Sequence, residues 1–219
     1  MGEKDYRSVL KDMRMADGTL MPIPVTLPVD GPDGLKIGSE VVLRSPSNEM
    51  LALMLVEEVF PWDLDAEITS VLGTTDSRHP LVSEMHTWGR HYCSGPLTVL
   101  NLPRHSDFQD LRSAPAEVRT ALETLDRENV VAYQPRHPMH RAHEALTKAA
   151  ASEVDGTLLL QPVVGITGYN DPDHYTRVRC YQALIEHYYD PGRTQLNLIP
   201  LAVRMAGPLA GLWHGIINR

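Results

Sequence analysis

The sequence has few cysteines and no long hydrophobic run. Only Cys93 and Cys180 occur among its 219 residues, far apart and outside any Cys-x-x-Cys pair. This argues against a disulfide framework and a thiolate zinc site, and favours the reduced thiols of a cytoplasmic protein. No apolar stretch approaches the roughly 20 residues of a membrane-spanning helix, and the charged segment 1–7 does not resemble a secretion signal. We therefore expect a cytoplasmic protein without a membrane partner.

An excess of positive charge is also absent. The formal net charge is -8 at pH 7, whereas general nucleic-acid binding depends on a broad basic face that neutralises phosphates. The composition, 42% hydrophobic and 22% charged, is typical of globular proteins, and the length suits one large or two small domains. The sequence thus argues against a nucleic-acid partner, and any anion must be bound by a local group of residues.

The first half of the chain has the pattern of a β-rich module. Residues 20–34 are broken by prolines and glycines, which predicts extended chain and turns rather than a helix. Residues 40–44 and 50–56 predict two strands, because apolar residues cluster on either side of the turn sequence Ser45-Pro46-Ser47-Asn48. A further strand is expected at 97–102.

The second half alternates strands with helices. This alternation is typical of an α/β domain with a parallel sheet. A helix over 115–128 joins the two halves, with Val118, Leu122 and Leu125 on one side. The predicted strands are 129–133, 157–161 and 196–201, and the predicted helices are 139–151, 174–189 and 208–217.

Segment 130–144 carries the most informative pattern, because a strand runs into a helix through a turn that is rich in arginine and histidine. Ligands of open α/β sheets bind at strand ends. Unpaired N–H groups and the helix dipole form an anion site at the start of the helix, which Arg136 would reinforce. His140 and His143 are three residues apart, so both rings can face the same polyphosphate.

Simpler interpretations stay open at this point. A His-x-x-His pair is common by chance and often marks surface or satisfied core residues. His137, His140 and His143 also repeat every third residue, which makes a zinc site conceivable, although no cysteine or carboxylate completes it in sequence. Arg177 and Arg179 cannot share a helix face, so one of them is expected to point to solvent or to a carboxylate.

Segment 134–144 resembles the ATP sulfurylase signature Gln-Thr-Arg-Asn-Pro-x-His-Arg-Ala-His-Glu. The resemblance covers nearly the whole chain, and it implies a PUA-like β-rich module over 1–114 followed by a Rossmann-like nucleotidyltransferase domain with a parallel sheet over 115–219. The further blocks that carry it are 15–24, 73–76, 161–165, 173–181 and 201–208.

The resemblance also implies the roles of individual residues. Gln134 and Arg136 would hold sulfate, and His140 and His143 would contact the phosphates of ATP. His137 would belong to the catalytic group with Arg136. Five residues would line the nucleotide pocket: Val164, Gly165, Met205, Ala206 and Gly207. For Gly165 and Gly207, a simple turn is the other interpretation.

The same resemblance implies the substrates and the partners. The substrates would be sulfate and ATP, the latter with Mg²⁺, and no metal would be bound by the protein itself. The protein would form a homo-oligomer. An adenylyl-sulfate kinase domain would belong to the parent protein, as in bifunctional relatives.

The sequence departs from the family pattern at four places: Pro135 replaces Thr, His137 replaces Asn, Gly168 replaces Lys, and Leu209-Ala210 replaces Arg-Glu. Proline removes a hydroxyl and a backbone N–H, and the loss of one preorganised donor can slow catalysis by roughly 10²–10³. The sequence also starts later than family members and stops before their Gly-Arg-Asp-His-Ala-Gly-Pro-Gly motif. We therefore expect either a sulfate adenylyltransferase, given as an excerpt of a longer protein, or a catalytically impaired scaffold domain.

Overall fold

The computed structural model describes residues 1–125, 128–165, 172–201 and 204–218. The chain forms two compact units, one from Met1–Arg104 with Arg204–Arg219, the other from His105–Val203. The sequence placed the boundary after residue 114 and assigned the whole C-terminal segment to the second domain. By contacts, the last helix, α7 (Pro208–Ile217), packs with the first unit.

The first unit contains two antiparallel sheets of three strands each. One has the order β1 (Pro28–Val29), β5 (His91–Ser94), β4 (Glu58–Pro61), and the other has the order β2 (Glu40–Arg44), β3 (Met50–Leu55), β6 (Leu97–Val99). The predicted hairpin is present, with Val42 opposite Leu53. The strand expected over 97–102 ends at Val99, and Leu102 is 73% exposed, because its backbone continues into a connection rather than a ladder.

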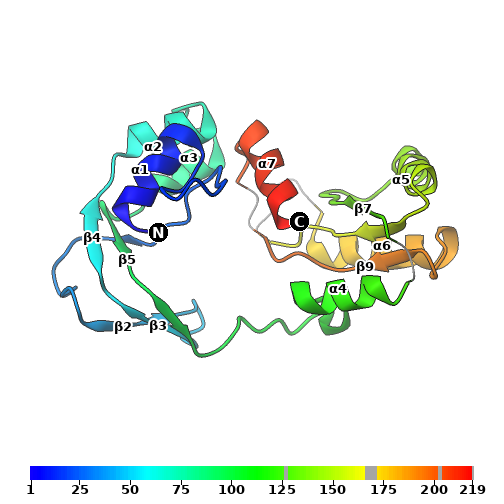
Figure 1. Ribbon diagram of the computed structural model, residues 1–219, viewed down its shortest axis with the longest axis horizontal. Coiled ribbons are helices and arrows are strands. Elements are labelled where there is room, and N and C mark those ends of the chain that lie inside the picture. Colours follow the sequence, from blue (N-terminus) through cyan, green and yellow to red (C-terminus); the bar gives the residue numbers. More distant parts are fainter. Residues whose placement is uncertain (126–127, 166–171, 202–203, 219) are drawn as a thin grey trace. The chain divides into compact units, whose positions relative to one another are not determined.

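Helices fill the rest of the first unit, and three of them were not predicted from the sequence. These are α1 (Glu3–Asp12), α2 (Leu64–Leu72) and α3 (Pro80–Met85). Their apolar faces meet the aromatic side chains of the strands in one cluster, and a second cluster joins Ala206 and residues of α7 to Ile23 and Val71. Figure 1 shows α1, α2 and α3 beside one another at one end of strands β4 and β5.

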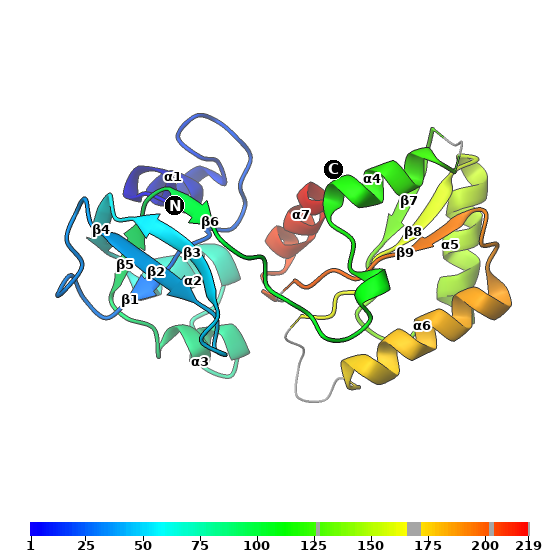
Figure 2. The same ribbon diagram turned by 90° about the horizontal axis from the view of Figure 1, so that it is seen from below.

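The second unit has the predicted parallel sheet. Its strands are β7 (Val130–Tyr133), β8 (Thr157–Leu160) and β9 (Thr194–Leu196), in the order β7-β8-β9. β8 is buried along its whole length, as expected for a central parallel strand. Helices α5 (Arg141–Glu153) and α6 (His174–Tyr188) lie on one face, and α4 (Pro115–Glu123) lies on the other (Figure 2).

Three predicted boundaries in the second unit were wrong. The last strand was placed at 196–201 but lies at Thr194–Leu196; beyond it, Leu198 and Ile199 are buried, and pairing continues only as an isolated parallel bridge between Ile199 and Val163. Helix α5 begins at Arg141 and not at 139, because His140 has extended backbone and caps it. Helix α4 ends at Glu123, and residues 126–127 of the longer predicted helix lie outside the described residues.

Within the described part of the chain, no helix is long and apolar enough to span a membrane.

Candidate active site

The loop between β7 and α5 lies at the carboxyl end of the parallel sheet. It continues the line of β7, because the N–H of Gln161 donates to the carbonyl of Tyr133 at 2.8 Å and that of Val163 to the carbonyl of Pro135 at 3.3 Å. Pro135 has no N–H for such a ladder and is buried. The loop is thus held against the segment that follows β8, at the edge of the sheet where α/β proteins bind ligands.

His140 and His143 lie together at the start of α5. The ring centroids are 3.9 Å apart. The Nδ1 of His140 accepts from the N–H of Ala142 at 3.3 Å, and the Nδ1 of His143 accepts from the N–H of His140 at 3.4 Å. Both rings therefore cap the free N–H groups of the helix, a task that serine, threonine, aspartate or asparagine usually performs.

This capping fixes the tautomer of both rings. Because each Nδ1 accepts a hydrogen bond from a backbone N–H, the proton of each neutral imidazole is carried by Nε2. His140 is exposed and His143 is half-buried. The pair therefore offers two Nε2–H donors beside the positive end of the α5 dipole, which is an arrangement suited to an oxyanion.

The backbone of the loop is held from below by α6. The carbonyl of Arg136 accepts from the Nη1 of Arg177 at 2.8 Å, and the carbonyl of His137 accepts from the hydroxyl of Tyr181 at 2.7 Å. Burial raises the pKa of Tyr181 to about 12, so this hydroxyl stays a donor at neutral pH. Gln134 and Arg136 are half-buried and His137 is exposed.

The segment after β8 forms the other side of the site in this unit. The N–H of Val164 donates to the carbonyl of Ile199 at 2.9 Å, and Val164 and Gly165 are both half-buried. Gly168, where the family has lysine, lies outside the described residues. The structure thus gathers most of the predicted site residues at one edge of the sheet: Gln134, Arg136, His137, His140, His143, Val164 and Gly165.

The remaining predicted residues, Met205, Ala206 and Gly207, are described with the first unit. Ala206 is 3% exposed and packs against Ile23 and Val71. Gly207 has φ 54° and ψ -127°, a conformation that is open essentially to glycine alone. Met205 also has a positive φ of 51°. Two residues of this segment, Met205 and Gly207, thus adopt positive φ angles, which an ordinary type I turn does not require.

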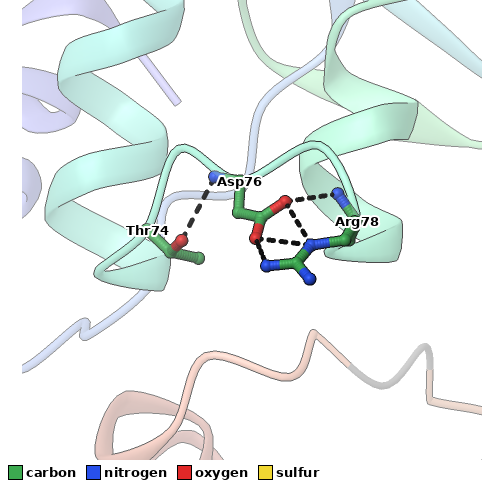
Figure 3. Close-up of polar contacts among 3 residues, drawn as sticks. All are labelled: Thr74, Asp76 and Arg78. Atoms are coloured by element: carbon green, nitrogen blue, oxygen red, sulfur yellow. Dashed lines mark hydrogen bonds and ion pairs between the residues drawn. The ribbon is translucent and has the colours of Figure 1, made fainter.

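The loop between α2 and α3 approaches Met205 in the first unit. The carboxylate of Asp76 accepts from the backbone N–H of Arg78 at 2.9 Å and from its Nε at 2.8 Å, and the Thr74 hydroxyl oxygen accepts from the N–H of Asp76 at 3.1 Å (Figure 3). The hydrogen bond with Arg78 lowers the pKa of Asp76. These contacts fix the loop that ends at His79, whose Nε2 lies 3.2 Å from the carbonyl oxygen of Met205.

Sequence reasoning missed two residues that shape these segments. Arg177 was weighed only against Arg179, and the structure shows Arg177 fully buried and Arg179 exposed. His79 follows the quoted block 73–76 but received no role. For the burial of Arg177, the one sequence signal is its position next to the apolar Val178 on a helix. Nothing in the sequence indicates the contact of His79.

The polar side chains that the loop offers to a ligand are mainly nitrogen groups: the guanidinium of Arg136 and the imidazoles of His137, His140 and His143. Among the described residues, no group of three or more histidine, cysteine, aspartate or glutamate side chains is placed to hold a metal ion. Mg²⁺ prefers oxygen ligands, which the phosphates of a nucleotide supply and the imidazoles of His140 and His143 do not.

The fold defines a nucleotidyltransferase-like α/β domain with a parallel sheet, preceded by a β-rich module. The ATP-sulfurylase family model matches residues 109–219, a little more than half of the chain, and the PUA-like domain model matches residues 1–102. The chain belongs to the ATP-sulfurylase family.

Relatives of known function agree with this assignment. The chain is 41% identical to the sulfate adenylyltransferase of Mycosarcoma maydis over 225 residues, which is 100% of this chain and 39% of that protein. It is 40% identical to the sulfate adenylyltransferase of Saccharomyces cerevisiae over 222 residues, 100% of this chain and 43% of that protein. The chain thus spans well under half the length of these relatives.

A solved structure has the same fold over the whole chain. The structure described as the hexameric APS kinase from Thiobacillus denitrificans matches with a TM-score of 0.78 and 27% sequence identity, covering 100% of this chain and 39% of that one. The match supports the two-part architecture of a PUA-like module followed by a nucleotidyltransferase-like domain.

Proposed function

We propose that this protein is a sulfate adenylyltransferase, which converts ATP and sulfate to adenylyl sulfate and pyrophosphate. The observation that carries the proposal is the pair His140 and His143, whose Nδ1 atoms are both bound to backbone N–H groups at the start of α5. Two Nε2–H donors at a helix N-terminus suit a polyphosphate. Family membership supplies the reaction that such a site would serve.

In the proposed reaction, a sulfate oxygen attacks the α-phosphorus of ATP in line. The bond between that phosphorus and the oxygen that bridges to the β-phosphate breaks, and pyrophosphate leaves with both electrons of that bond. His140, His143 and the α5 dipole stabilise the negative charge that develops on the leaving group. Such preorganised stabilisation is usually the largest catalytic contribution, and positioning supplies the rest.

The other predicted site residues take the following roles in this proposal. Gln134 and Arg136 hold sulfate, with His137 beside them. Val164 and Gly165 contact the nucleotide, and Met205, Ala206 and Gly207 keep the nucleotide-lining role that the family resemblance implies. Mg²⁺ enters as part of the substrate, bound to the phosphates of ATP.

We further propose the cellular setting that the sequence indicated: a cytoplasmic homo-oligomer whose parent protein also carries an adenylyl-sulfate kinase domain. The similarity to a protein described as a hexameric APS kinase supports the last two points. Size-exclusion chromatography with light scattering on the chain and on its parent protein tests the oligomer.

The second candidate is a scaffold domain that keeps the fold without turnover. It is favoured by one observation: the signature loop has the buried Pro135 and the exposed His137 where the family has threonine and asparagine. Such a domain would bind the nucleotide and release no pyrophosphate.

A pyrophosphate-release assay separates the two candidates. Release that requires both ATP and sulfate supports the enzyme, and ATP binding without release supports the scaffold. His143→Ala should abolish the release, whereas the control His187→Ala, at an exposed position on α6, should leave it unchanged. Normal turnover of His143→Ala would contradict the assignment of the imidazole pair.

A further inference from the structure

Arg177 is a fully buried arginine next to the anion-binding loop. Its exposed fraction is 0%. Its Nη1 donates to the carbonyl of Arg136 at 2.8 Å and to the carbonyl of Val163 at 3.1 Å. A single nitrogen of α6 thus joins the loop after β7 to the segment after β8, which are the two segments that carry the site residues of this unit.

Among the residues that the structure describes, the rest of the guanidinium group has no hydrogen-bond partner. Nε and Nη2 are both buried, and no carboxylate among the described residues forms an ion pair with Arg177. Removing a charge from water without a counter-charge is strongly unfavourable. If the only task were to bind two carbonyls, a neutral donor would perform it without this penalty. The uncompensated charge therefore indicates that the positive charge of Arg177 has a role besides its two hydrogen bonds.

The hydrogen bonds of Arg177 also determine which way two peptide groups face. In a trans peptide the C=O and the next N–H point in opposite directions, and the structure contains no cis peptide among the described residues. The carbonyl of Val163 faces Arg177, so the N–H of Val164 faces away and reaches the carbonyl of Ile199 at 2.9 Å. By the same geometry the N–H of His137 faces away from Arg177.

We propose that Arg177 is a positioning residue of the anion site: it orients the peptides 136–137 and 163–164 and places a permanent positive charge behind the bound polyphosphate or sulfate. The proposal rests on the proposed function, because that function supplies the anion. Arg177 itself does not touch the substrate, since it has no exposed surface. Arg136, His140 and His143 make the contacts, and Arg177 acts through the backbone and through its field.

Gln161 supports the same interpretation. It is 8% exposed, and its Oε1 is buried without a hydrogen-bond partner. Its N–H continues the ladder to Tyr133 at 2.8 Å, so it lies where β8 ends. Buried polar atoms without partners are rare in native structures, and here Arg177 and Gln161 contribute them at the same edge of the sheet. This concentration of polar groups at the strand end fits a site whose electrostatics serve a bound anion nearby.

The test compares Arg177→Met, which removes the charge and the donors, with Arg177→Lys, which keeps the charge but cannot hold two carbonyls as a guanidinium does. Arg179→Met is the matched control, because Arg179 lies on the same helix and is exposed. Pyrophosphate is titrated into each variant by calorimetry. We expect Arg177→Met to bind it roughly tenfold more weakly or worse, Arg177→Lys to stay closer to wild type, and Arg179→Met to equal wild type. Equal affinity of Arg177→Met and Arg179→Met would overturn the role of the charge.

A second measurement tests the positioning without any ligand. Hydrogen exchange of peptides covering 134–143 and 160–165 should be faster in both Arg177 variants than in Arg179→Met, with the peptides of α4 unchanged. Unchanged exchange in the two segments would overturn the positioning role. If wild type binds no pyrophosphate, the proposed function fails and the role of the charge fails with it, whereas this measurement still decides the positioning.

A third measurement uses the wild-type protein, in case Arg177→Met does not fold. The Nε–H signal of Arg177 in an ¹⁵N spectrum is assigned by its absence in Arg177→Lys. We expect this signal to be protected from exchange with water and to move when pyrophosphate is added. A signal that exchanges rapidly and does not respond to pyrophosphate would overturn the proposal.

Discussion

The Nε2 of His79 lies 3.2 Å from the carbonyl oxygen of Met205. Residues 126 positions apart in the sequence are thereby joined within the first unit. Met205 has a positive φ, and the following Ala206 is buried against Ile23 and Val71. The shape of the segment 205–207 is therefore determined by the β-rich module and its helices.

His79→Ala should loosen this segment. The loss of one hydrogen bond should lower the free energy of unfolding by about 1 kcal/mol, and the amides of 206–210 should exchange faster. If the segment lines the nucleotide pocket, ATP should also bind more weakly. Hydrogen exchange, thermal unfolding and an ATP titration measure the three effects. His86→Ala, at an exposed position at the end of α3, is the control; identical exchange in the two variants would contradict the prediction.

Variants of His140 separate helix capping from anion binding. His140→Ala removes the cap and should lower stability by about 1 kcal/mol. His140→Asp should restore or improve the cap, because aspartate is a good N-cap residue and its charge suits the helix dipole. The same negative charge should repel a phosphate or a sulfate, so binding of the anion should be weaker than in His140→Ala.

The comparison needs His140→Asn as its reference, since asparagine caps without a charge. We expect thermal stability in the order Asp and Asn above Ala, and pyrophosphate affinity in the order Asn above Asp. If the aspartate variant bound pyrophosphate as well as the asparagine variant, the anion would not lie at the start of α5.

The second unit was predicted well from the sequence because its signals are local. Strands of consecutive apolar residues alternate with helices, and β7, β8, α5 and α6 were expected within two or three residues of their observed bounds. The exception was β9, where the longest apolar run follows the strand. Regular sheet pairing ends at Leu196, although the residues after it stay buried and Ile199 still forms an isolated bridge with Val163.

The helices of the first unit were missed for different reasons. Helix α1 is mostly charged and buries only Tyr6 and Val9, so its apolar pattern is sparse. Helix α2 did carry signals, because Asp63 caps its start and Gly73 its end. In sequence, these caps stand among the many prolines and glycines of a β-rich half, where the same residues also mark turns.

The candidate site was predictable only in part. The spacing of His140 and His143 and the family signature indicated the loop. Both signals lie within a short stretch of consecutive residues. The burial of Arg177 depends on carbonyl groups 41 and 14 positions away. Such long-range contacts leave no periodic trace in the sequence, which is why Arg177 and His79 emerged only from the structure.

A glycine-to-alanine comparison tests the sheet connection of the first unit. A Cβ on Gly95 would lie 1.8 Å from the carbonyl oxygen of Leu55, whereas one on Gly31 would meet nothing within 4 Å. Gly95→Ala should therefore lower the free energy of unfolding by about 4 kcal/mol or more, and Gly31→Ala should change it by at most about 0.5 kcal/mol. Chemical denaturation measures both. Similar stabilities of the two variants would contradict the close approach of β3 and the turn before β6.

A buried carboxyl group gives the first unit a specific pH dependence. The Oε2 of Glu67 accepts from the hydroxyls of Tyr6 and Tyr92, each at 2.8 Å, and Glu67 is 4% exposed. Burial raises the pKa of Glu67 above its ordinary value of 4.5, and the two tyrosine hydrogen bonds only partly oppose this. Because the folded state favours the protonated form, its stabilising contribution is complete below pH 4.5. That contribution is lost as the pH rises through the folded-state pKa.

Glu67→Gln should remove this dependence, because the amide keeps the shape and an acceptor oxygen but does not ionise. Between pH 4.5 and the raised pKa, wild type should lose about 1.4 kcal/mol per pH unit relative to the variant. Burying the amide N–H groups of glutamine can lower the stability of the variant by a constant amount. Such an amount shifts its curve of stability against pH without changing the slope. Thermal unfolding from pH 4 to pH 8 measures the difference, with the exposed Glu84→Gln as control. Parallel curves for wild type and Glu67→Gln would mean that Glu67 ionises in the folded protein as readily as in the unfolded chain.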